Sequence, residues 1–124
     1  MKKMLLLIAV FITTTTFAQR YTTNSVSEYQ QLYGKKYTFI KTLLNVECKW
    51  EVSDKKINRE YDNNGGADWD VIKVIKIPGG KKYMLNEFGV DNPWIIIDQS
   101  GFIQLYEENG QTLHKFKIIR KEPL

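Results

Sequence analysis

The sequence has one cysteine, one histidine and three prolines in 124 residues. A single cysteine excludes a disulfide within the chain, and no Cys/His spacing typical of a zinc site is present. No glycine-rich phosphate loop occurs either, so a nucleophilic pair would have to combine Cys48 with His114. Cys48 lies within an apolar row, whereas reactive thiolates occupy partly exposed, electropositive surroundings. We therefore predict no catalytic residues, no cofactor and a protein that is not an enzyme.

The only long apolar run is at the start of the chain, over residues 4–12. Two lysines precede it, and a threonine tract and the small residue Ala18 follow it, which is the order of a secretory signal peptide. The run falls short of the roughly 20 apolar residues that a membrane-spanning helix needs. We expect residues 1–18 to be removed by cleavage between Ala18 and Gln19. The mature chain would then be periplasmic or extracellular.

The excess of positive charge is small. Loss of Lys2 and Lys3 with the signal peptide lowers the formal net charge from +4 to +2. Nucleic-acid binding needs a clustered basic face, so a nucleic-acid partner is not expected. The remaining residues, 19–124, are enough for one domain with its own core.

Most of this domain has the pattern of strands. Ser25 or Ser27 can cap a short helix that reaches Tyr33 and ends at Gly34. The segment that follows alternates apolar and polar residues and predicts a half-buried strand, with the apolar positions Leu44, Val46, Cys48, Trp50 and Val52. Turn sequences then recur at residues 53–56, 78–80, 98–101 and 109–110. The sequence thus predicts an all-β fold, an antiparallel meander of about eight strands closing into a small barrel or sandwich.

The stretch Trp69–Ile77 repeats Val-Ile-Lys and is rich in β-branched residues, which favours a strand over a helix. Period-2 alternation puts Ile72 and Val74 on one face. The opposite face is broken only by Lys73 and carries Trp69, Val71, Ile75 and Ile77. Both faces need cover, which the N-terminal helix or a partner protein would supply.

Two tight turns set the registers of two hairpins. A turn at 54–55 places Arg59 opposite Trp50, and a turn at 109–110 places His114 opposite Leu105, both on apolar sides. A buried arginine needs an anion or several carbonyl groups as partners. Arg59 therefore either stacks on Trp50 and bonds a loop carboxylate such as Asp62, or it binds an acidic ligand inside the barrel. His114 is either a hydrogen-bonded core residue or part of the same ligand site.

The stretch that follows Tyr61 is rich in oxygen-bearing side chains, of which Asp62, Asn64, Asp68 and Asp70 are the candidate ligands. Such side chains suit calcium, but Lys73 stands where a calcium loop would close with glutamate. Turn chemistry alone accounts for this composition. These four residues are the only candidates for a metal site, and none is predicted.

The order of a short helix, the segment "LYGKKYTF" (residues 32–39) and a meander of about eight strands resembles small secreted lipocalin-like (calycin-type) β-barrels over most of the mature chain. That family opens its first strand with Gly-x-Trp, whereas Gly34 is followed here by two lysines and Tyr37, so no individual residue is carried over. The resemblance implies a cup for a small apolar or amphiphilic ligand.

Two hypotheses follow. In the first, the chain is a binding protein for a small apolar or acidic amphiphilic ligand, whose cup is lined by Trp50, Arg59, Tyr61 and His114. In the second, it is a protein-interaction or inhibitor module that uses the strand face Trp69, Val71, Ile75 and Ile77. An open interior with an unpaired Arg59 favours the first, and a filled interior with that face bare favours the second.

Overall fold

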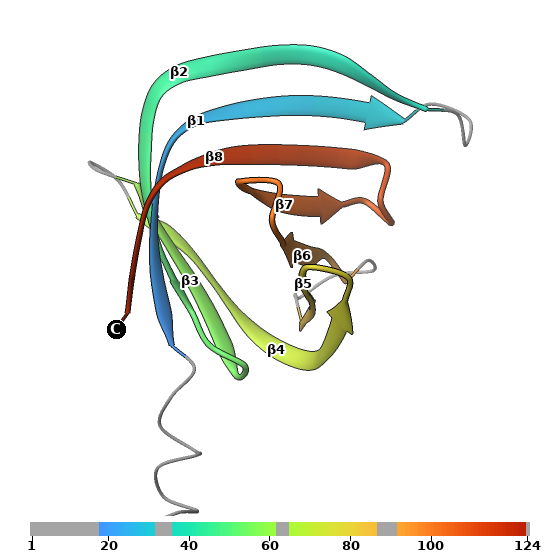
Figure 1. The fold of residues 1–124 in the computed structure, drawn as a ribbon. Coiled ribbons are helices and arrows are strands. Elements are labelled where there is room, and N and C mark those ends of the chain that lie inside the picture. The colour runs from blue at the N-terminus through green and yellow to red at the C-terminus, as the bar shows by residue number, and fades with distance from the viewer. Residues whose placement is uncertain (1–17, 32–35, 62–64, 87–91, 124) are drawn as a thin grey trace, which may run out of the picture.

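In the computed structural model, residues 18–31, 36–61, 65–86 and 92–123 are described. They form eight antiparallel strands that pair in chain order and close into a barrel (Figure 1), which confirms the predicted all-β meander. The strands are β1 (Gln19–Gln31), β2 (Tyr37–Val52), β3 (Lys56–Tyr61), β4 (Gly66–Ile77), β5 (Gly80–Asn86), β6 (Trp94–Ile97), β7 (Phe102–Glu107) and β8 (Thr112–Pro123). Within these ranges no helix is long and apolar enough to cross a membrane.

The N-terminal helix prediction is wrong over its described part, because Ser25–Gln31 belongs to β1. β1 pairs with β2 on one side and with β8 on the other, and this pairing overrides the local capping signal. At Glu28 and Tyr29 the pairing with β2 shifts because Ile40 of β2 is an extra residue, while β1 itself pairs regularly with β8 over Val26–Gln30. Residues 32–34 lie outside the described part.

The two predicted hairpin registers are confirmed. Trp50 pairs with Arg59 between β2 and β3, and Leu105 pairs with His114 between β7 and β8. The turn between β4 and β5 also forms as expected, with Ile77 opposite Gly80. In this turn Gly79 has φ of 78°, a left-handed conformation that glycine adopts without strain.

The faces predicted for β4 are only partly correct. Its pairing with β5 shifts between Val71 and Lys73, and Ile72 bulges out and is 59% exposed. After the bulge the inward face changes phase, so Val71 and Val74 both pack against the core. Ile72 was expected beside Val74, and this expectation is wrong.

The barrel core is built around Trp50. Its ring stacks at 6.5 Å from that of Trp69 and meets Phe116 edge-on at 4.8 Å. The indole Nε1 donates a hydrogen bond of 3.1 Å to Thr23 Oγ1, which satisfies its one polar atom. Branched side chains fill the rest of the core, among them Val52, Ile57, Leu85, Ile95, Ile103 and Leu105.

One residue of the predicted apolar row does not reach the core. Leu44 is 72% exposed, although it was expected on the inward side with Cys48. The pairing with β1 shifts between these two residues, and Asn45 there has φ of 59°. The bulge reverses the direction of the side chains, so the alternation in the sequence continues but the inward face does not.

Candidate functional site

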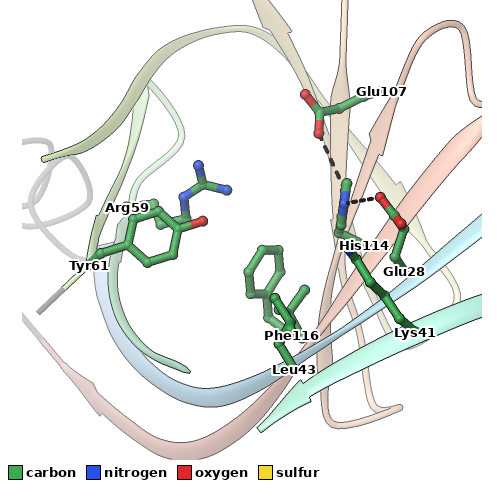
Figure 2. A pocket seen from close by; sticks show the side chains of 9 residues that line it. Glu28, Lys41, Leu43, Arg59, Tyr61, Glu107, His114 and Phe116 are labelled. Atoms are coloured by element: carbon green, nitrogen blue, oxygen red, sulfur yellow. Dashed lines mark hydrogen bonds and ion pairs between the residues drawn. The ribbon is translucent and has the colours of Figure 1, made fainter. Parts of the chain in front are cut away.

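A cavity of about 270 Å³ lies beside this core, between β1, β2, β3, β7 and β8. Figure 2 shows its side chains arranged around a central space. The lining is Val26, Glu28, Lys41, Leu43, Arg59, Tyr61, Glu107, His114 and Phe116.

Arg59 is the cation at the inner end of this cavity. Its guanidinium carbon lies 4.9–5.7 Å from the centroids of the Tyr61, Trp69, Trp50 and Phe116 rings. These rings attract the positive charge through cation–π interactions but do not replace hydrogen-bond acceptors. Its Nε is buried without a hydrogen-bond partner, and no ion pair to Arg59 is present among the described residues. The carboxylate predicted to bond Arg59, that of Asp62, lies outside the described residues.

His114 faces Arg59 from β8 and is held between two carboxylates (Figure 2). Its Nε2 lies 3.2 Å from Glu28 Oε1, and its Nδ1 lies 3.4 Å from Glu107 Oε1. The interaction with Glu107 raises the pKa of His114 above its ordinary 6.5, with a further contribution from Glu28. The same interaction lowers the pKa of Glu107, and the charge of Arg59 adds to this effect. The trio thus places an imidazole between two carboxylates that favour its protonated form.

The charges around the cavity do not balance. Glu28 and Glu107 both contact His114, which offsets one of their two negative charges when it is protonated. Lys41 and Arg59 add two further cations. The lining therefore carries one more positive than negative charge when His114 is protonated. Neither carboxylate lies within ion-pair distance of Arg59. This arrangement suits the binding of one anionic group.

Among the described residues, no serine, threonine or cysteine lines the cavity. The chain's only cysteine, Cys48, is fully buried in the core. His114 and Glu107 form a carboxylate–imidazole pair, but such a pair activates a nucleophile only when one lies within hydrogen-bond reach.

Three of the four predicted cup residues meet at this cavity, namely Arg59, Tyr61 and His114. Trp50 does not line it; the indole lies beneath Arg59, at 5.6 Å from ring centroid to guanidinium carbon. Sequence reasoning missed Glu107, although alternation from Leu105 in the correctly predicted hairpin puts it on the same face.

Glu28, Lys41 and Leu43 were also missed. Glu28 had been assigned to a helix, and the faces of Lys41 and Leu43 depend on two bulges in the β1–β2 pair. No short-range signal marks these bulges.

The predicted interaction face is not a single surface. Trp69 is buried and Val71 packs against the core, whereas Ile75 and Ile77 lie beyond the bulge and are half-buried. The bulge at Ile72 therefore divides the four residues between two sides of the sheet.

Of the candidate metal ligands, Asp62 and Asn64 lie outside the described residues. Asp68 accepts a hydrogen bond of 2.6 Å from Asn58 Nδ2, and Asp70 is exposed on β4. Across the described ranges, no group of three or more acidic, histidine or cysteine side chains is placed to hold a metal ion.

No family model, no curated protein and no solved structure matches this chain. The lipocalin-like resemblance therefore stays a resemblance.

Proposed function

We propose that this chain is a non-catalytic binding protein whose barrel cavity takes a small, acidic and partly apolar ligand. One observation carries the proposal: the Arg59 guanidinium faces a cavity and has no carboxylate partner among the described residues. A charge held inside a protein without a partner is costly, so a site of this kind gains most from an anion that enters from outside.

The remaining lining indicates the chemistry of that ligand. A carboxylate matches the planar guanidinium, since two parallel N–H···O bonds can form at once. Val26, Leu43 and Phe116 offer apolar contacts to the rest of the molecule. The volume of about 270 Å³ lies just below the usual range of ligand pockets, roughly 300–1,000 Å³. The ligand is therefore compact.

The protein would meet this ligand outside the cytoplasm. The charged, apolar and small-residue order of residues 1–18 supports export and cleavage before Gln19. Intact-mass measurement of protein from its own host should give a chain that begins at Gln19. A mass that includes Met1 would contradict export by this segment.

The binding proposal is tested by thermal unfolding with and without octanoate and phenylacetate. Binding to the folded state stabilises it by about 2.7 kcal/mol when the ligand is at 100 times its Kd. Arg59→Met keeps the packing of the side-chain stem and removes the charge. It should leave the Tm without ligand nearly unchanged and abolish the shift caused by both acids.

Arg20→Met is the matched control. Arg20 lies on β1, half-exposed, and forms an ion pair of 3.1 Å with Glu51 away from the cavity. This variant should keep the full ligand-induced shift. A loss of several degrees in Arg59→Met without ligand would assign Arg59 to the structure, and no shift from either acid in the wild type would overturn the proposal.

A further inference from the structure

The two halves of β2 differ in their neighbours. β1 pairs with both halves of β2, with interruptions at Ile40 and at Asn45–Glu47, but β3 pairs only with Cys48–Val52. On the side away from β1, none of the described strands pairs with residues 37–47, and Figure 1 shows this run of β2 as the outermost strand. The backbone of this run therefore presents an open sheet edge with unpaired N–H and C=O groups.

This edge has little of the protection that natural edges usually carry. Between Tyr37 and Val46 the only charged residue is Lys41. Several apolar side chains are largely exposed along it, with Phe39 at 55%, Leu43 at 48% and Leu44 at 72%. The pairing of β2 with β1 shifts on both sides of Lys41–Leu44, but these four residues pair with β1 without a shift. A regular run of this kind is a template for another strand.

The same edge forms one wall of the cavity. Lys41 and Leu43 line the cavity, whereas Thr42 lies on the other side and its Oγ1 is 2.9 Å from Ser27 Oγ. Side chains directly opposite each other on paired strands have Cβ atoms about 4.5–5.5 Å apart. A strand added beside Lys41 and Leu43 would thus place its inward side chain at the cavity that contains Arg59.

We propose that the open edge of β2 takes an extended polypeptide segment as an added strand, with the carboxylate of a glutamate or aspartate side chain inserted toward Arg59. The insertion rests on the proposed function, in which Arg59 binds a carboxylate. Lys41 and Arg59 supply the complementary charge, and a cavity of about 270 Å³ is large enough for one side chain. A second copy of this chain, paired through the same edge, supplies no such group, because residues 37–46 contain no acidic residue.

The test uses an acetylated and amidated peptide, Thr-Val-Thr-Glu-Thr-Val-Thr, and its variant with glutamine in place of glutamate. Binding is measured by calorimetry, and the contact surface by amide chemical shifts of the protein. The glutamate peptide should bind at least about tenfold tighter than the glutamine peptide, because only its carboxylate is charged and can pair with Arg59. A tenfold difference corresponds to about 1.4 kcal/mol. The affected amides should cluster at residues 38–46.

Two N-methylated versions of the peptide separate strand addition from simple carboxylate binding. Each blocks the N–H groups of one edge of the peptide and keeps every side chain. Methylation of the edge that faces β2 should abolish binding, and methylation of the other edge should be tolerated. Equal binding by both versions would overturn strand addition.

The remaining outcomes distinguish this inference from the proposed function. If octanoate binds at Arg59 but the glutamate peptide binds no tighter than acetyl-glutamate amide, strand addition is overturned and the proposed function stands. If Arg59→Met does not lower the affinity of the glutamate peptide to that of the glutamine peptide, the insertion toward Arg59 is overturned. A concentration-dependent dimer that shifts the same β2 amides without peptide would assign the edge to a second copy.

Discussion

Both halves of β2 are rich in apolar side chains, but only the second half buries most of them. In the second half, Cys48, Trp50 and Val52 alternate with charged residues and are buried, because β1 and β3 flank them on both sides. In the first half, Phe39 and Leu44 remain exposed beside a single neighbouring strand. Apolar side chains of β2 are therefore buried only where the strand has neighbours on both sides. Alternation in the sequence does not by itself show where those neighbours are.

The largest expected difference between the halves is in stability. Trp50→Ala removes a fully buried ring and its hydrogen bond to Thr23, and it should lower the free energy of unfolding by about 3–5 kcal/mol. Leu44→Ala changes an exposed residue and should stay within about 0.5 kcal/mol. Urea unfolding of both variants measures this contrast. Similar losses in the two variants would show that the first half of β2 is packed in solution.

A second expected difference is in chemical access. Cys48 has no exposed surface, so a thiol reagent should label it slowly until denaturant is added. In a Cys48→Ala background, Leu44→Cys places a thiol on the exposed half and should react at the rate of an unfolded peptide. Mass spectrometry over time follows both reactions. Rapid labelling of Cys48 in the native protein would contradict the burial of the second half of β2.

The smallest effect concerns pH and the His114 trio beside the open half. A raised pKa means that His114 contributes its full stabilisation below 6.5 and loses it as pH rises through the raised value. A lowered pKa means that Glu107 contributes above 4.5 and loses its stabilisation as pH falls through the lowered value. The contribution of this pair to stability is therefore greatest between these two ordinary values.

Urea unfolding at about pH 5.5 and about pH 8.5 should show a lower free energy of unfolding at the higher pH in the wild type. His114→Gln should reduce that difference, since His114 is the only histidine in the chain. An unchanged difference in the variant would assign the pH dependence to other groups.

Sequence reasoning succeeded where a short turn fixes the register. The β2–β3 and β7–β8 hairpins have tight turns, so the inward direction of Arg59 and His114 followed from counting residues. It failed where an extra residue enters a strand, at Ile72 and near Asn45, because tertiary pairing and not local composition sets such bulges.

Some residues of the cavity were not predicted, because strand pairing that the local sequence does not indicate places them there. Glu28 lies on β1, whose two neighbours are β2 and the distant β8. No pattern of period two or 3.6 indicates that Glu28 meets His114, 86 residues further along the chain. Lys41 and Leu43 depend in turn on the pairing of β1 with β2. These contacts follow from the tertiary pairing of the strands and not from the local sequence.

The most direct test of Arg59 as a carboxylate receptor is the ¹⁵N NMR signal of arginine Nε–H groups during titration with octanoate. The chain has three arginines, and Arg20 and Arg120 lie on the exposed side of the barrel, each beside a glutamate. The Arg59 signal should shift with octanoate and saturate, while the other two stay in place. An Arg59 signal that does not move, or that moves no more than those of Arg20 and Arg120, would contradict the account.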